Sequence, residues 1–115
     1  MILLVLNDKF NEFIVEIGEN SRDNEDLVNN SNPDDIWIHL SNFSSPHIVI
    51  HNNGLEVTKE GLYRCASNIR KYKKSIPSTP IKVKYTTISN LITSKINHFL
   101  NEGSVICRKY KEFYI

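Results

Sequence analysis

The chain has 115 residues, of which 40% are hydrophobic and 23% charged, and its formal net charge is +1. These values are typical of one globular domain with a modest core, and they argue against a disordered or fibrous chain. No segment approaches the roughly 20 apolar residues of a membrane span, and the short apolar opening lacks the basic start of a signal peptide. We therefore expect an intracellular, cytoplasmic protein.

The N-terminal half favours strands. The apolar run Met1–Leu6 and the alternating segment Glu12–Ile17 predict two strands joined as a hairpin. Turn-forming residues follow, and Asn24–Val28 predicts one short helix. Asp35–Leu40 and His47–His51 alternate again, which predicts two further strands.

Alternation divides the last two strands into an aliphatic face and a polar, aromatic face. If the strands pair antiparallel, the aliphatic face belongs to the core and the opposite face gathers several rings. The aliphatic set is Ile36, Ile38, Leu40, Ile48 and Ile50. The opposite set is Trp37, His39, His47 and His51.

The C-terminal half contains the main helix. Thr58 is a suitable N-cap, and an apolar stripe predicts a helix from there to about Lys74. Ile81–Thr86 predicts a strand, whereas 88–100 is compatible with a short helix or a loop.

A closing hairpin is predicted at the end of the sequence, with strands at Ser104–Cys107 and Glu112–Ile115 around the basic turn 108–111. The pattern as a whole predicts a single α+β domain over 1–115. Its mostly antiparallel sheet has about seven strands, with one main helix packed on a face.

Charge is distributed unevenly along the chain. Residues 1–60 hold three basic and eleven acidic residues, whereas 61–115 hold eleven basic and two acidic ones. Such asymmetry predicts a basic face, for which phosphate backbones are the commonest ligand. A solvated helix surface that binds nothing is the alternative. The candidate phosphate contacts are Arg64, Arg70, Lys71, Lys73, Lys74, Lys82, Lys84 and Lys95.

Three interpretations compete for the cluster formed by Asp35, Trp37, His39 and His47. Exposed Trp and His rings stack on unpaired bases. Alternatively, the Trp belongs to the core and the polar groups satisfy one another. In the third interpretation, Asp35, His39 and His47 perform acid–base chemistry on a phosphodiester or bind a metal.

No other chemical site is indicated. Cys65 and Cys107 are isolated, so we expect small buried thiols rather than a zinc site or a disulfide. Phosphate-binding glycine loops are missing, which argues against nucleotide hydrolysis. We expect no metal and no cofactor.

The central motif resembles the NFACT-R domain, the RNA-binding module of ribosome quality-control proteins. Asp35-Ile36-Trp37-Ile38-His39, followed by His47 and apolar residues, is similar to that family's D-x-W-x-H…H signature. Weaker similarities occur in the same order along the chain. They are Gly18-Glu19-Asn20, Asn24-Glu25-Asp26-Leu27, Val83-Lys84-Tyr85-Thr86, Gly103-Ser104-Val105-Ile106 and Tyr110–Ile115.

The resemblance implies nucleic-acid binding. Larger members use several domains to bind stalled large ribosomal subunits and tRNA while they add C-terminal tails to nascent chains. The similarity here covers one domain, so this tailing function is not carried over. Three positions depart from the family pattern: Pro46, His51 and Ile92. Two of them replace cations, which predicts weaker phosphate binding or a shifted ligand.

Taken together, the sequence predicts a non-catalytic module that binds RNA. We expect it to bind tRNA or another structured RNA in preference to DNA, and the family resemblance implies association with the ribosome. Trp37, His39 and His47 would shape the pocket beside the lysines, and protonated histidines would strengthen binding below about pH 6.5. An RNA-processing enzyme and a protein-interaction adaptor are the alternatives. A weak homodimer through an edge strand is left open.

Overall fold

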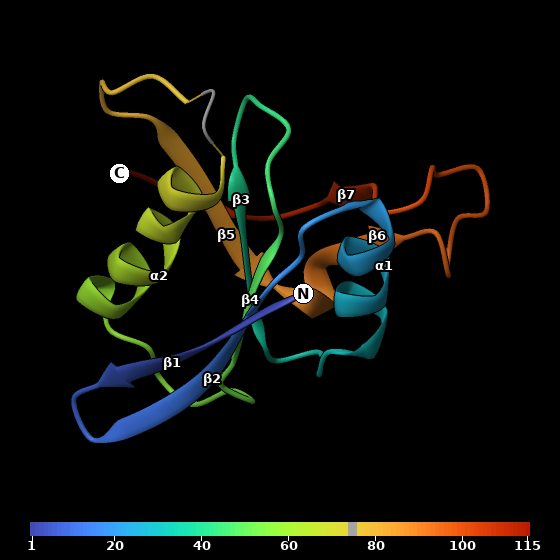
Figure 1. Cartoon of the computed structure of the whole chain (residues 1–115). Helices are drawn as coiled ribbons and strands as arrows, with labels where there is room; N and C mark the ends of the chain where they lie inside the picture. The colour runs from blue at the N-terminus through green and yellow to red at the C-terminus, as the bar shows by residue number, and fades with distance from the viewer. Residues whose placement is uncertain (74–75) are drawn as a thin grey trace.

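The computed structural model describes residues 1–73 and 76–115 (Figure 1). Its strands are β1 (Ile2–Asp8), β2 (Asn11–Ile17), β3 (Ile36–Leu40), β4 (Ile48–His51), β5 (Lys82–Thr87), β6 (Leu91–Thr93), β7 (Val105–Cys107) and β8 (Lys111–Tyr114). Its helices are α1 (Ser21–Asn30), α2 (Lys59–Tyr72) and the 3₁₀-helix η1 (Ile88–Asn90). Lys74, one of the predicted phosphate contacts, lies outside the described residues.

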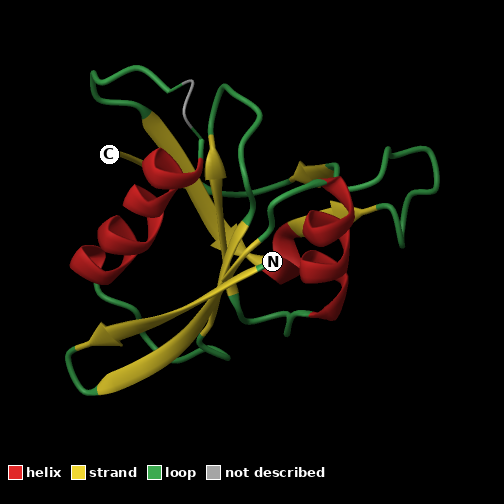
Figure 2. Cartoon of the chain, in the orientation of Figure 1, coloured by secondary structure: helices red, strands yellow, loops and turns green. Residues whose placement is uncertain are grey.

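A six-stranded sheet in the order β1-β2-β4-β3-β5-β8 organises the domain, and all its neighbouring strands run antiparallel. β6 and β7 form a separate two-stranded sheet. The predicted α+β class, with a mostly antiparallel sheet and one main helix, is therefore confirmed (Figure 2).

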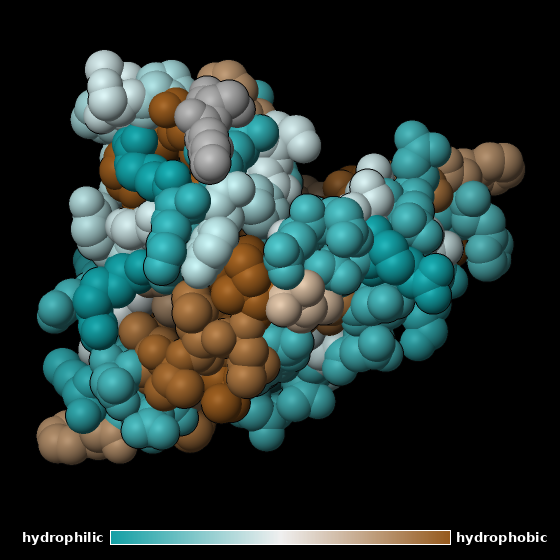
Figure 3. All heavy atoms as spheres, in the orientation of Figure 1, coloured by the Kyte–Doolittle hydropathy of each residue, from teal (hydrophilic) through white to brown (hydrophobic). Residues whose placement is uncertain are grey.

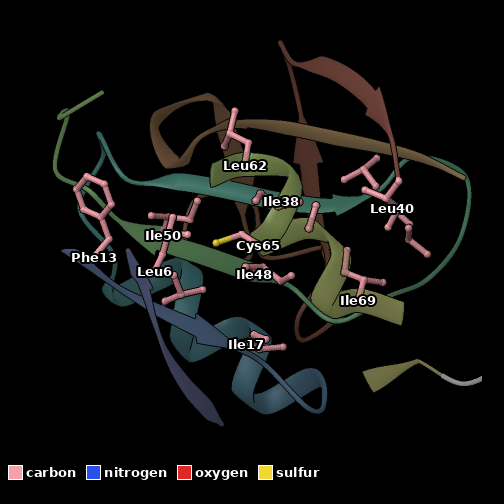
Figure 4. Close-up of a cluster of buried hydrophobic side chains, with 14 of the residues drawn as sticks. Leu6, Phe13, Ile17, Ile38, Leu40, Ile48, Ile50, Leu62, Cys65 and Ile69 are labelled. Atoms are coloured by element: carbon pink, nitrogen blue, oxygen red, sulfur yellow. The ribbon is translucent and has the colours of Figure 1, made fainter. Parts of the chain in front are cut away.

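The main helix α2 packs on the aliphatic face of the sheet. Thr58 caps it, because its side chain accepts a hydrogen bond from the backbone N–H of Gly61. The apolar stripe predicted for this helix is buried at Leu62, Cys65, Ala66 and Ile69. These side chains meet the strand residues labelled in Figure 4, among them the predicted core residues Ile38, Leu40, Ile48 and Ile50.

The opposite face of the sheet is covered over its two middle strands, β3 and β4. There α1 and the small β6–β7 sheet lie against it (Figure 1). A second core cluster results, made of Leu27, Val28, Trp37, Val49 and Leu91. The domain therefore has two cores, one on each side of its sheet.

The first helix is longer than predicted. It spans Ser21–Asn30 instead of the expected Asn24–Val28. Asn20 is the cap, since its side chain accepts a hydrogen bond from the backbone N–H of Asp23. The polar residues that resembled a loop are thus the capped first turn, a position that Asn and Asp favour.

The predicted closing hairpin is wrong. β7 pairs with β6, and β8 pairs with β5 at the edge of the main sheet. Between them, Arg108 donates hydrogen bonds from its backbone to Asn90 and from its guanidinium to Ser89. These bonds hold the chain near η1, and β8 continues to the free edge of β5, where Val83 faces Phe113.

The other edge of the sheet is the apolar strand β1. Leu3 and Val5 remain 64% and 54% exposed on it, and Figure 3 shows apolar side chains gathered around this strand. The weak homodimer through an edge strand stays a prediction, and β1 is the edge that offers apolar contacts for it.

Candidate nucleic-acid interface

Three rings of the central motif meet on the face that α1 covers. The rings of Trp37 and His39 stack with centroids 5.4 Å apart, and the His47 ring stands edge-on to both, at 5.5 Å and 5.0 Å. Trp37 and His39 are alternate residues of β3, whereas His47 directly precedes the neighbouring strand β4. The expectation that these side chains lie close together is confirmed for the three rings, whereas His51, the fourth predicted member, contacts Asp35 and Glu16 instead.

This cluster is buried at its centre. Trp37 is 1% exposed and His47 4%. The indole N–H of Trp37 donates a hydrogen bond to Nδ1 of His47 at 3.1 Å, so the polar atom of the indole is satisfied inside the protein. The structure therefore contradicts an exposed base-stacking surface made of Trp37 and His47. Among the rings of the motif, His39 is partly exposed.

The glycine–asparagine segment upstream positions His47. The backbone N–H of Gly18 donates to the carbonyl of His47 at 2.9 Å, and the side-chain oxygen of Asn24 accepts from the N–H of His47 at 3.3 Å. A Cβ at Gly18 would lie 2.0 Å from that same oxygen of Asn24. Glycine at position 18 therefore leaves room for the Asn24 side chain that holds the backbone of His47.

Both histidines of the cluster favour the neutral state. Burial lowers the pKa of His47 to about 3, and the neighbouring charges of His39 and Lys84 act in the same direction. Burial also lowers the pKa of His39, against the raising effect of its hydrogen bond to the Leu40 carbonyl. The bond from Trp37 requires an unprotonated Nδ1 on His47. His47 is therefore neutral near pH 6.5, so its charge does not support the predicted gain in binding below that pH, which stays a prediction.

Asp35 does not join the histidines of the cluster. Its carboxylate lies 2.9 Å from Nδ1 of His51, whose Nε2 lies 2.8 Å from Glu16. The same carboxylate accepts backbone hydrogen bonds from Asn32 and Asn53. This buried network ties β4 to β2 and to the turn before β3. It leaves Asp35 engaged with His51 rather than with His39 or His47, so the acid–base trio of the third interpretation is not assembled.

The described residues contain neither a metal-binding cluster nor a reactive thiol. Across 1–73 and 76–115, no three His, Cys, Asp or Glu side chains come together in a way that could hold a metal ion. Burial raises the pKa of the Cys65 thiol to about 12 and also raises the pKa of Cys107. Low thiolate content makes both poor nucleophiles and poor ligands.

The β5–β8 side of the same sheet face carries lysines against aromatic rings. The ammonium group of Lys84 lies 5.3 Å from the ring centre of Tyr110 and 5.9 Å from that of Trp37. Lys82, two residues earlier on β5, lies 5.7 Å from the ring of Tyr114. We call the four residues Lys82, Lys84, Tyr110 and Tyr114 the lysine–tyrosine strip. His39 borders it, because His39 faces Lys84 across the β3–β5 pair.

The other predicted cations divide into two groups. Arg70 and Arg64 have structural partners. Arg70 donates hydrogen bonds to the carbonyls of Pro77, Thr79 and Ile115, and Arg64 donates to the carbonyl of Asn7. Arg70 thus commits three of the five N–H donors of its guanidinium to the fold, whereas the bond of Arg64 uses one.

The remaining cations lie at the end of α2 and in one distant loop. Lys71 and Lys73 lie at or just after the last turn of α2, and the charge of Lys73 is felt at His39. Lys95 is exposed in the loop that projects beyond β6 (Figure 1). The predicted basic set therefore does not form one face.

Sequence reasoning missed part of the basic surface. Lys109 and Lys111 are exposed beside Tyr110, and they line a pocket together with Tyr85 and Asn90. The basic turn 108–111 contained the necessary signal, an aromatic residue between lysines. From the sequence alone, these residues are predicted to form only the turn of a hairpin, because the two closing strands are expected to pair with each other.

Within the described residues, no helix is long and apolar enough to cross a membrane.

Known proteins share both the sequence pattern and the fold. Coiled-coil domain-containing protein 25 from Bos taurus and from Mus musculus is 30% identical over 84 residues, which cover 69% of this chain and 40% of each relative. The chain thus spans less than half the length of these curated relatives. The C-terminal part of a fibronectin/fibrinogen-binding protein from Streptococcus suis has the same fold, with a TM-score of 0.77 and 20% identity, covering 90% of this chain and 40% of that one.

The family model described as the NFACT protein RNA binding domain matches residues 4–109. That match covers the second core, the ring cluster and most of the first core, whereas β8 (Lys111–Tyr114) and the buried Ile115 lie beyond it. The resemblance drawn from the central motif is thereby confirmed, and the chain belongs to the NFACT RNA-binding domain family.

Proposed function

We propose that this domain binds RNA without catalysing a reaction, and that it contacts the phosphates of tRNA or another structured RNA through the lysine–tyrosine strip. The observation that carries the proposal is the pairing of Lys82 and Lys84 with aromatic rings on the β5–β8 side of the sheet face that α1 covers only over its middle strands. Family membership supports RNA as the ligand. We also propose that the domain associates with the ribosome.

Local charge supports the same surface. The segment from residue 61 onward, which contributes the strip, has eleven basic and two acidic residues. One of the two acids, Glu112, accepts a hydrogen bond from the hydroxyl of Ser41. In the structure Glu112 faces Lys84 across the β5–β8 pair, whereas Lys82 faces Tyr114. Two lysines against one carboxylate leave the strip with net positive charge, which attracts polyanions at long range and does so less as salt is added.

The C-terminal end of α2, a helix on the other face of the sheet, brings Lys73 toward the border of the strip. Lys73 is close enough to lower the pKa of His39, which borders the strip. Lys71 lies with its ammonium 5.5 Å from the ring centre of Tyr72. We assign both lysines to the phosphate contacts, as expected from the sequence, whereas Arg64 and Arg70 serve the fold.

Fluorescence anisotropy with labelled tRNA tests the proposal. We expect the double variant Lys82→Ala/Lys84→Ala to bind about tenfold or more weakly near physiological salt, and its salt slope to fall by about two, one for each lost contact. The matched control is Lys9→Ala/Arg22→Ala, which removes two exposed cations from the acidic half. Equal affinities of the double variant and the wild type would refute the proposal. Indifference to tRNA, single-stranded RNA and duplex DNA alike would favour a protein-interaction adaptor instead.

A further inference from the structure

A pocket lies where β5 ends and the chain enters β8. It is lined by Tyr85 and Thr87 from β5, Asn90 from η1, and Lys109, Tyr110 and Lys111 from the segment after β7. Its volume is about 350 Å³. Pockets that enclose small organic ligands start at about 300 Å³, so the space suits one nucleotide rather than a helix of RNA.

The lining of this pocket selects a flat, anionic ligand. None of its lining residues is acidic, whereas two are lysines with exposed side chains. Two are tyrosines, and each ring is held in place by a neighbour. The Tyr85 ring meets Phe113 edge-on at 5.6 Å, and the Tyr110 ring lies 5.3 Å from the ammonium of Lys84. Tyr110 nevertheless remains 47% exposed, which leaves ring surface for a ligand.

Asn90 adds a polar group of fixed direction. Its side-chain nitrogen donates hydrogen bonds to the hydroxyls of Thr86 and Thr87 at 2.9 Å and 3.3 Å. The amide is therefore oriented from inside the fold, and its carbonyl oxygen is the group left for a ligand. An acceptor of this kind complements the N–H groups on the edge of a nucleobase.

We infer that this pocket holds one unpaired nucleotide of a bound RNA. The base stacks on Tyr110, its edge faces Asn90, and the adjoining phosphate lies between Lys109 and Lys111. Bases that are not paired are the ones proteins splay out onto aromatic side chains, whereas a duplex offers mainly phosphates. The inference rests on the proposed function, since Lys84 belongs both to the strip and to the surroundings of Tyr110.

Two RNA hairpins of identical stem separate this inference from general RNA binding. One has a blunt end, and the other carries a short single-stranded 3′ overhang. We expect the wild type to bind the overhang hairpin about five- to hundredfold more tightly, the gain of one stacked base. Tyr110→Ala removes a ring of the strip as well, so the readout is the ratio between the two complexes rather than either affinity alone. The overhang hairpin should lose about five- to hundredfold more affinity than the blunt one. Tyr110→Phe, which keeps the aromatic ring, should retain the gain.

Tyr63→Ala is the matched control, because Tyr63 is 50% exposed on α2 and does not line this pocket. It should leave the ratio between the two hairpins unchanged, and thermal melting should show all variants folded. Equal binding of both hairpins by the wild type would overturn the inference and leave the proposed function standing. Binding of neither hairpin would overturn both. Tyr110-dependent binding of AMP, without any gain from the overhang, would assign the pocket to a free nucleotide and also overturn the inference.

Discussion

Two neighbouring regions of one sheet face have opposite roles. In the middle, Trp37 and His47 lie under α1 and β6, hydrogen-bonded to each other and almost without solvent contact. On the β5–β8 side, Lys82 and Lys84 lie over exposed tyrosines. The residues that identify the family from sequence thus build the scaffold. The surface that we propose for RNA consists of lysines and tyrosines outside that motif.

The largest expected effect concerns Trp37. Trp37→Ala should lower the free energy of unfolding by about 3–5 kcal/mol, because it empties a fully buried site and leaves Nδ1 of His47 without its donor. Chemical denaturation measures this loss. Trp37→Phe, which keeps most of the volume, should cost less. If Trp37→Ala kept the wild-type stability and lost RNA binding, Trp37 would belong to the binding surface rather than to the scaffold.

The second prediction concerns pH. In the unfolded chain His47 has a pKa of about 6.5, whereas in the folded protein burial lowers the pKa to about 3. The unfolded state therefore binds the extra proton first as the pH falls. The stability that neutral His47 contributes is complete above about pH 6.5 and is lost toward pH 3, by at most about 1.4 kcal/mol per pH unit.

Denaturation curves recorded between these two pH values check the slope. His39 adds to it in the same direction, since its pKa is also lowered. A variant of the exposed His98, such as His98→Gln, serves as control and should keep the wild-type slope. A stability that does not change over this pH range would contradict the buried, neutral state of His47.

A third prediction separates folding from binding. Thr58 caps α2 on the far face of the sheet, and its backbone N–H donates to the buried carboxylate of Asp8. Thr58→Ala should cost about 1 kcal/mol of stability. RNA affinity measured well below the melting temperature should stay at the wild-type value, because neither residue belongs to the strip. A parallel loss of affinity would mean that binding follows stability rather than the strip.

The smallest expected effect on stability is at Lys84. Lys84→Ala should change the free energy of unfolding by no more than about 0.5 kcal/mol, since the residue is partly exposed and has no ion pair within the described residues. The same variant should weaken RNA binding measurably in anisotropy titrations. A loss of stability comparable to that of Trp37→Ala would place Lys84 in the scaffold.

Much of the fold could be predicted from short-range patterns. Alternation in β3 and β4 identified the core face, and the stripe after Thr58 identified α2, because both signals arise from neighbouring residues. The partner of β7 could not be found in the same way. Pairing β8 with β5 instead of β7 depends on which sheet edge is free, and that follows from the arrangement of the whole chain.

The candidate site was predictable only in part. Residue spacing brought the rings of Trp37, His39 and His47 together, but it did not indicate that α1 would bury them. Counting charges indicated a basic half, yet it did not separate Arg70, whose guanidinium holds three carbonyls, from the exposed Lys109 and Lys111. Side-chain hydrogen bonds make that distinction, and they are not encoded by composition.

Amide chemical-shift mapping during titration with a short RNA hairpin tests the central claim most directly. We predict that the shifts concentrate on β5, on 108–114 and on the end of α2. The amide chemical shifts of the hairpin formed by β1 and β2 should not change. Shifts confined to α1 or to that hairpin, with β5 unaffected, would contradict the account and place the RNA on the acidic half of the domain.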